Sequence, residues 1–110
     1  MVVSRMASRS VSGVVLAAGP SRRFGDRPPK QLLVFDGEPL VRRVVGRALG
    51  SRLFEVIVVV GKAACEVERS CQGLDVQIVV NPDFESGQSL SVKLGLAAVD
   101  PTADAVMFIP

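Results

Sequence analysis

Four short aliphatic runs, at residues 13–18, 54–60, 76–80 and 105–109, are predicted to form β-strands. Apolar residues follow one another in these runs, without the polar alternation typical of a strand that has one face in water. Strands of this kind are covered on both faces, as parallel sheets require. The pattern therefore predicts a parallel sheet with helices on both sides.

The segment after Pro39 has a helical period. Pro39 suits the start of a helix, and Gly50 suits its end. Arg42, Arg43 and Arg47 fall on one face, which we interpret as solvated. The opposite face carries the apolar residues Leu40, Val41, Val44, Val45, Ala48 and Leu49.

Two further helices are predicted, a less regular one over 63–72 and another that begins near Ser89. The latter would direct Leu90, Leu94 and Ala97 inward and stop before Asp100, because a residue that precedes proline disfavours the helical conformation. The order of elements is then βαβαβαβ.

This order predicts an α/β fold with a Rossmann-like, doubly wound, mostly parallel sheet. Right-handed crossovers would place the first and fourth strands beside each other at the topological switch point, where such sheets bind ligands. We expect residues 1–12 to be a disordered tail and residues 13–110 to form one domain.

Length and composition agree with one small domain. The chain has 110 residues, of which 48% are hydrophobic, enough for a core. A net charge of +2 is too small to favour nucleic acid or a membrane surface as a partner. The sequence has neither a membrane-length apolar run nor a secretory signal at its start, so we expect a cytoplasmic protein.

The residues available for catalysis exclude several reaction types. The chain has no histidine, which removes serine–histidine and cysteine–histidine hydrolase mechanisms. Cys65 and Cys71 lie on different faces of the predicted second helix and are interpreted as ordinary reduced thiols.

A glycine turn and a cluster of cations follow the first strand. Gly19 ends the apolar run, and Arg22, Arg23, Arg27 and Lys30 come within the next eleven residues. Backbone amides and fixed cations at the end of a strand are typical of a phosphate-binding loop. The spacing does not match a Walker loop or a dinucleotide-binding G-x-G-x-x-G turn.

The loop sequence LAAGPSRRFG at 16–25, followed by Lys30, resembles the signature of the MobA-like nucleotidyltransferases, which include the molybdenum-cofactor cytidylyl- and guanylyltransferases. A second segment, Asn81-Pro82 followed by SGQSLS at 86–91, is similar to the loop and helix that face the nucleotide in that family. The resemblance extends over residues 13–110.

The resemblance implies roles for individual residues. The main chain at 16–18 would meet the base, and Gly19 would let the backbone approach the phosphates. Arg23 and Lys30 would be catalytic, because they would hold the triphosphate and stabilise the charge that builds as pyrophosphate leaves. The nucleotide-binding residues implied are Leu16, Ala17, Ala18, Gly19, Ser21, Arg22, Asn81, Gly87 and Ser89.

Simpler interpretations stay open for several of these positions. Asn81 is equally suited to a strand-ending turn, and Ser89 to capping the third helix, which is the interpretation we favour for it. Gly87 suits plain loop geometry. Arg22 and Arg27 suit a solvated surface as well as a phosphate site.

The implied reaction is the transfer of CMP from CTP to the phosphate of molybdopterin or a related acceptor. Ala18, where the guanylyl type has glycine, favours CTP. The family holds Mg²⁺ through an aspartate in a segment that would follow Pro110, so no metal ligand is expected within this chain. The alternatives are a non-catalytic nucleotide-binding module and a nucleotidyltransferase that acts on a sugar phosphate or an alcohol phosphate.

The end of the sequence carries an expectation of its own. Pro110 directly follows the last apolar strand, where a nucleotide-binding α/β fold normally has a functional loop. We therefore expect the chain to be the N-terminal part of a nucleotidyltransferase-like domain. Its exposed sheet edge would favour oligomers.

Overall fold

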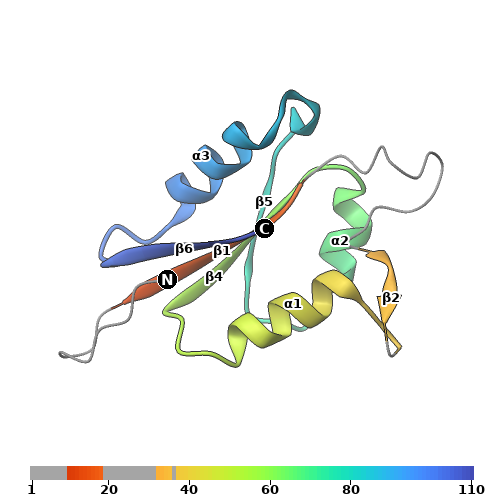
Figure 1. Ribbon diagram of the computed structural model, residues 1–110, viewed down its shortest axis with the longest axis horizontal. Coiled ribbons are helices and arrows are strands. Elements are labelled where there is room, and N and C mark those ends of the chain that lie inside the picture. Colours follow the sequence, from red (N-terminus) through yellow and green to blue (C-terminus); the bar gives the residue numbers. More distant parts are fainter. Residues whose placement is uncertain (1–9, 19–31, 36) are drawn as a thin grey trace.

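The computed structural model describes residues 10–18, 32–35 and 37–110. Its main sheet has four parallel strands in the order β5-β4-β1-β6 (Figure 1). The strands are β1 (Val11–Ala17), β4 (Glu55–Val60), β5 (Gln77–Val80) and β6 (Ala105–Ile109). The predicted α/β class and the four predicted strands are confirmed, with bounds that differ by two residues at most.

The order in which strands are added to the sheet changes direction at β1. From β1 it moves outward to β4 and β5, and it then returns to place β6 on the other side of β1. Val14 is in register with Ile57 of β4 and with Phe108 of β6. The first and fourth predicted strands are therefore neighbours, and the switch point lies between β1 and β6 as expected.

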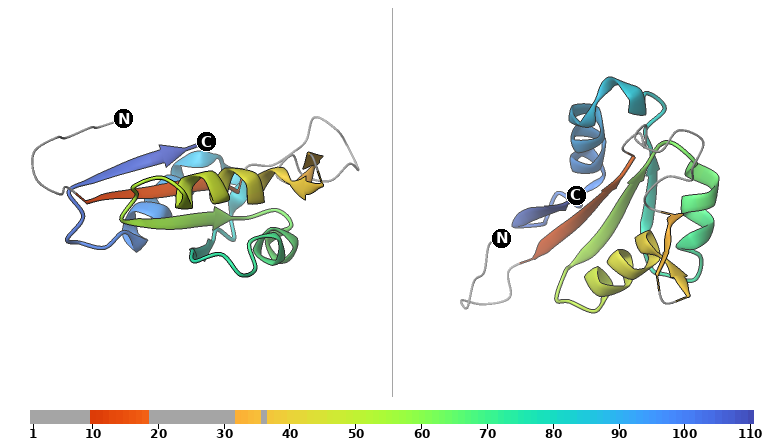
Figure 2. Two further views of the ribbon diagram at one scale, coloured as in Figure 1. Left: turned by 90° about the horizontal axis from the view of Figure 1, so that it is seen from below. Right: turned by 45° about the vertical axis from the view of Figure 1, so that its right-hand side comes forward.

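Helices cover both faces of this sheet (Figure 2). Helices α1 (Leu40–Leu49) and α2 (Ala64–Ser70) lie on one face, and α3 (Gln88–Ala98) lies on the other. Side chains of a strand alternate between the faces, so Val15 and Val58 pack beneath α1, whereas Val14 and Val59 pack beneath α3. Burial on both faces accounts for the unbroken apolar runs.

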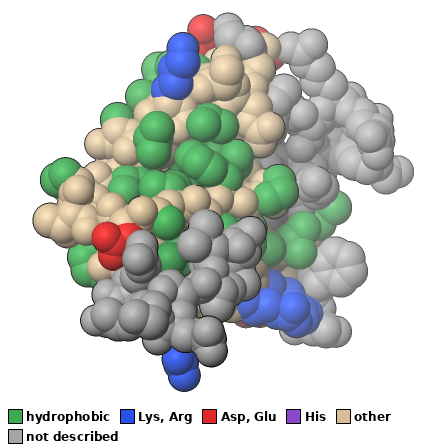
Figure 3. All heavy atoms as spheres, turned by 60° about the vertical axis from the view of Figure 1, so that its left-hand side comes forward, with side chains coloured by type: hydrophobic (Ala, Val, Ile, Leu, Met, Phe, Trp, Pro, Cys, Tyr) green, Lys and Arg blue, Asp and Glu red, His purple; other side chains and the backbone are tan. Residues whose placement is uncertain are grey.

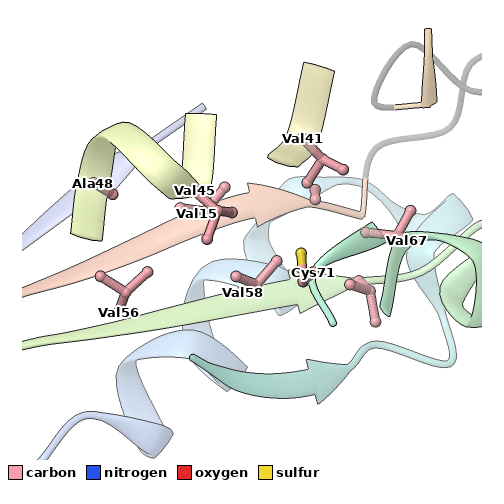
Figure 4. Close-up of a cluster of buried hydrophobic side chains, with 10 residues drawn as sticks. Val15, Val41, Val45, Ala48, Val56, Val58, Val67 and Cys71 are labelled. Atoms are coloured by element: carbon pink, nitrogen blue, oxygen red, sulfur yellow. The ribbon is translucent and has the colours of Figure 1, made fainter. Parts of the chain in front are cut away.

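The core beneath α1 follows the predicted helical period. Val41, Val45 and Ala48 of α1 are buried and belong to the same cluster as Val15 and Val58 of the sheet (Figure 4). Val67 of α2 and Cys71 complete one side of this cluster.

The arginine face of α1 is not simply solvated. Arg42 donates from Nη1 to the carbonyl oxygens of Ser70 and Gln72, at 2.9 and 3.0 Å. It thereby pairs one carbonyl of the last residue of α2 and one just beyond the helix, where carbonyls have no partner within the helix. Our interpretation of Arg42 as a solvated residue is wrong, because the outer side of α1 faces the end of another helix.

The two cysteines differ in environment, as their spacing predicts. Cys65 is exposed and Cys71 is buried, and both are free thiols. Burial raises the pKa of the Cys71 thiol, and the positive charge of Arg42 offsets part of that rise.

Two short elements were not among the predicted strands and helices. The short strands β2 (Val34–Phe35) and β3 (Glu38–Pro39) pair in antiparallel register, with Gly37 in the left-handed conformation at φ 86°. A 3₁₀ turn, η3 (Phe84–Ser86), precedes α3. Both elements are too short to give a periodic sequence pattern.

Glu55 joins three elements at the amino end of the sheet. Its Oε2 accepts hydrogen bonds from Ser12 Oγ at 2.6 Å and from the backbone N–H of Asp100 at 2.7 Å. Ser12 is fully buried. These bonds fix the start of β1 and the connection that follows α3.

The inward face of α3 differs from our prediction. Ser91 and Gly95 are buried, whereas Ala97 is exposed and Leu90 and Leu94 are only partly covered. A Cβ atom built on Gly95 would lie 2.5 Å from Val14 Cγ1. The helix approaches the sheet so closely that only small residues fit on its inner face, and apolarity alone does not predict that face.

Two helical glycines should respond oppositely to substitution by alanine. Gly95→Ala is expected to lower the free energy of unfolding by about 1–3 kcal/mol through overpacking against Val14 and Val59. Gly46→Ala, in α1, is expected to raise it by about 0.5–1 kcal/mol, because nothing lies within 4 Å of the new Cβ and alanine favours the helix. Urea denaturation measures both, and a stable Gly95→Ala protein would contradict the close approach of α3.

The side of the molecule that carries α3 and β6 has apolar residues at its surface (Figure 3). They include Leu96 of α3 and Phe108 of β6. Within the described sheet, β6 pairs with β1 alone, so its other edge is open. Association through this edge stays a prediction. None of the helices in the described ranges has the length and apolar character needed to cross a membrane.

Candidate functional site

Three strand ends meet at the carboxyl edge of the sheet. Ala18 follows β1, Gly61 follows β4 and Asn81 follows β5. The backbone N–H of Asn81 donates to the carbonyl oxygen of Val60 at 2.7 Å, which extends the ladder by one residue. The edge that a doubly wound sheet uses for ligands is therefore built from residues that we predicted and from Gly61, which we did not.

Gly61 lies where Ala18, after β1, and Phe84 of η3 (Phe84–Ser86) both come close to the end of β4. A Cβ atom at Gly61 would lie 2.5 Å from Phe84 Cβ and 3.0 Å from both the Cβ and the carbonyl oxygen of Ala18. Phe84 belongs to η3, so the end of β1 and the turn before α3 both rest on this glycine. The sequence signal was a glycine directly after an apolar strand, the same signal that singled out Gly19.

The described part of the first motif, residues 16–18, turns its side chains into the protein. The side chains of Ala17 and Ala18 are 2% exposed, and Ala18 packs against Gly61. Leu16 is partly buried and packs with the cluster beneath α3. Burial of the side chains is compatible with the expectation that the backbone at 16–18 meets the base.

The cationic loop falls outside the described residues. It contains the predicted residues Gly19, Ser21, Arg22, Arg23, Arg27 and Lys30. Their roles stay predictions. Within the described part of this edge, Lys62 adds a half-buried cation directly after Gly61, a residue that we did not single out.

Asn81 points into the protein. Its side chain is 0% exposed, its Nδ2 donates to Ser91 Oγ at 2.8 Å, and its Oδ1 accepts from the N–H of Asp83 at 2.8 Å. The second of these bonds is an Asx turn, which agrees with the strand-ending interpretation. Ser91, its partner on α3, is a residue that we did not single out either.

Gly87 and Ser89 begin α3. Gly87 is the N-cap, with φ 105° and ψ −178°, a conformation open essentially to glycine alone. Ser89 lies inside the first turn and is exposed. Our prediction that Ser89 caps the helix is wrong, because α3 begins one residue earlier and its N-cap makes no side-chain hydrogen bond.

Metal ligands do not gather in the part of the chain that the structure describes. Across residues 10–18, 32–35 and 37–110, no three His, Cys, Asp or Glu side chains lie close enough to share an ion. These residues do not form a metal centre by themselves.

Residues 16–18 of the first motif and Asn81 of the second thus lie at one edge of a doubly wound sheet. Residues 13–110 match the sequence profile of the MobA-like NTP transferase domain. The chain belongs to this family. The matched range includes β1 from Gly13 onward, the cationic segment after it and the helix α3. The fold and the family of transferase enzymes are therefore those that the sequence predicted.

Similar proteins carry several names. The chain is 40% identical over 88 residues to nicotine blue oxidoreductase of Paenarthrobacter nicotinovorans, which covers 80% of this chain and 43% of that protein. It is 30% identical over 105 residues to the bifunctional protein GlmU of Sorangium cellulosum, which covers 90% of this chain and 22% of GlmU.

A solved structure gives the fold match. A nucleotidyl transferase from Methanothermobacter thermautotroptrophicus superposes with a TM-score of 0.83 at 29% identity, over 93% of this chain and 50% of that one. The chain spans less than half the length of these two curated relatives and about half the length of the solved structure.

Proposed function

We propose that the protein to which this chain belongs is a nucleotidyltransferase that transfers CMP from CTP to the phosphate of molybdopterin or a related acceptor and releases pyrophosphate. The observation that carries the proposal is the family match over 13–110 together with the backbone edge at Ala18, Gly61 and Asn81. We further propose that the protein works in the cytoplasm.

The reaction is a single displacement at phosphorus. An oxygen of the acceptor phosphate attacks the α-phosphorus of CTP and forms the new P–O bond, while the bond to the β-phosphate oxygen breaks and its electrons leave with pyrophosphate. No covalent enzyme intermediate is needed, so the protein contributes position and charge. In this proposal Arg23 and Lys30 hold the triphosphate and stabilise the leaving pyrophosphate.

The nucleotide would be held mainly by main-chain groups. The backbone at Leu16, Ala17 and Ala18 meets the base, and Gly19, Ser21 and Arg22 form the loop around the phosphates. In this proposal Gly87 and the exposed Ser89 contact the nucleotide from the start of α3. The first turn has no acidic residue that would repel a phosphate.

Magnesium is proposed from the resemblance alone. A relative from Mycobacterium tuberculosis, Rv0371c, is known in complex with manganese; it is 30% identical and has a TM-score of 0.72 over 91% of this chain and 49% of that one. Because the described residues do not form a metal centre, assays of this chain should include each divalent ion separately.

The relatives favour two other candidates. The GlmU match allows a different phosphorylated acceptor on the same nucleotide site, such as a sugar phosphate or an alcohol phosphate. The 40% identity to an oxidoreductase favours redox chemistry on the same scaffold. A nicotinamide or flavin cofactor that bound in place of CTP would identify the latter.

The proposed function is tested by titrating CTP, GTP and NADH into this chain in a calorimeter, with Mg²⁺ or Mn²⁺. We expect CTP to bind most tightly, and Lys30→Ala to weaken it roughly 10- to 100-fold, because a hydrogen bond to a charged group contributes about 1.5–3 kcal/mol. Pyrophosphate release with each acceptor class then tests transfer.

The matched control is Arg52→Ala. Arg52 is an exposed cation between α1 and β4, at the amino end of the sheet, and its removal changes the net charge equally. The affinity of the Arg52→Ala variant for CTP should stay within about twofold of that of the unmodified chain. An unmodified chain that binds neither CTP nor GTP contradicts the proposal, and so does equal weakening by both substitutions.

A further inference from the structure

One buried side chain connects the elements on the α3 side of the site. Asn81 uses its own N–H to continue the ladder from Val60, its Oδ1 to hold the N–H of Asp83, and its Nδ2 to reach Ser91 on α3. The end of β4, the turn after β5 and the first half of α3 are thus joined through one residue.

We propose that Asn81 and Ser91 are a positioning pair that sets the nucleotide-facing segment 82–89 without touching the nucleotide. The inference rests on the proposed function, and it assigns Asn81 a different role from the direct contact that the family resemblance implies. Ser91 has no role assigned by the resemblance.

Burial separates positioning from direct contact. Asn81 is 0% exposed and Ser91 is 3% exposed, and both polar atoms of the Asn81 amide are engaged within the protein. A nucleotide could reach this amide only if a buried hydrogen bond broke, which leaves a buried polar group unpaired. An indirect role requires no such change.

The packing of α3 explains why the hydrogen bond between Asn81 and Ser91 matters. Ser91 and Gly95 are four residues apart and share the inner face of the helix. Gly95 sets how closely α3 approaches Val14. Contacts between small residues, however, oppose a sliding movement of the helix along its own axis only weakly. The Asn81–Ser91 bond is directional and ties the helix to the end of β5.

The position of α3 also determines where the residues proposed to face the nucleotide lie. Gly87 and Ser89 precede Ser91 on the first turn, and Phe84 of η3 rests on Gly61. A shift of the first turn would therefore move the groups that the proposal places against the nucleotide. Misplacement of about 1 Å is enough to lose much of the benefit of a preformed site.

The test compares Ser91→Ala with Ser12→Ala in the full chain. Both serines are buried, and each donates or accepts one side-chain hydrogen bond, but Ser12 lies at the opposite end of the sheet. We expect Ser91→Ala to weaken CTP binding by about tenfold, whereas Ser12→Ala changes it less than about twofold at a similar loss of stability.

Hydrogen exchange of the free protein gives a readout that needs no ligand. In Ser91→Ala, amides at 83–90 should exchange faster, and in Ser12→Ala they should exchange as in the unmodified chain. Asn81→Ala should reproduce both effects, and the double variant should be no weaker in CTP binding than Asn81→Ala alone, because the two residues act as one unit.

The outcomes separate the two proposals. If the unmodified chain binds CTP and Ser91→Ala binds equally well, or if Ser12→Ala weakens binding as much as Ser91→Ala does, the positioning pair is refuted while the proposed function stands. If the unmodified chain binds no nucleotide, the proposed function fails. In that case, unchanged exchange at 83–90 in Ser91→Ala refutes the positioning pair as well. Faster exchange confined to 83–90 supports the role of the pair in holding this segment in place.

Discussion

Gly61→Ala is expected to lower the free energy of unfolding by about 1–3 kcal/mol and to weaken CTP binding at least about tenfold. The new Cβ would lie 2.5 Å from Phe84 Cβ and 3.0 Å from the carbonyl oxygen of Ala18. Neither atom is the free end of a flexible side chain, so either the backbone at Ala18, after β1, or the turn before α3 must move. Urea denaturation measures the first effect and calorimetry measures the second.

Gly50→Ala is the matched control for this substitution. Gly50 has an ordinary right-handed conformation at the end of α1, and a Cβ there would meet backbone atoms no closer than 3.5 Å. Its stability should change by less than about 0.5 kcal/mol and its affinity for CTP should not change. Wild-type stability in Gly61→Ala would show that the edge is looser than the structure has it. Lost stability with full CTP affinity would show that Gly61 does not shape the site.

Ile57→Ala is expected to have the largest effect on folding, a loss of about 2–5 kcal/mol. Ile57 is 0% exposed in β4, one of the two inner strands of the sheet, and belongs to the cluster beneath α3. The substitution removes buried methyl and methylene groups and leaves a cavity that neighbouring strands cannot close. A domain of this size is stable by only about 5–15 kcal/mol, so the midpoint of urea denaturation should fall substantially.

Leu96→Ala serves as the control for Ile57→Ala. Leu96 lies on the outer side of α3 and is 52% exposed, and both leucine and alanine favour helix. The free energy of unfolding should change by less than about 0.5 kcal/mol. A loss below about 1 kcal/mol in Ile57→Ala would mean that the sheet face beneath α3 is not packed as described.

The strands were predictable because a strand buried on both sides of a sheet needs an unbroken run of apolar residues, which distinguishes it from a loop or an exposed strand. The buried face of α1 was predictable from its helical period. β6 has the predicted bounds, 105–109, and α1 directs Val41, Val45 and Ala48 inward as its period requires. The family motif depended on a few residues at fixed spacing. Its position at the switch point followed from the order of strands, which right-handed crossovers restrict to few possibilities.

The α3 side of the site could not be predicted in the same way. Leucines at helical spacing indicated the wrong inner face, because the distance between α3 and the sheet admits only Ser91 and Gly95 at the closest contact. Asn81 gave a signal that suited a ligand contact and a turn equally well. Only its burial and the 2.8 Å bond to Ser91 distinguish the two.

By itself, the sequence determined that this protein has a doubly wound sheet, belongs to a family of nucleotidyltransferases and carries Gly19 and a cluster of cations after its first strand. These properties are local: they depend on apolar runs, helical periods and short motifs. The tertiary structure alone decided that Gly61 supports Ala18 and Phe84, that Arg42 pairs the end of α2 and that Asn81 holds α3. The reason is that each of these contacts joins residues from different elements, and their distances are set by how closely whole layers pack.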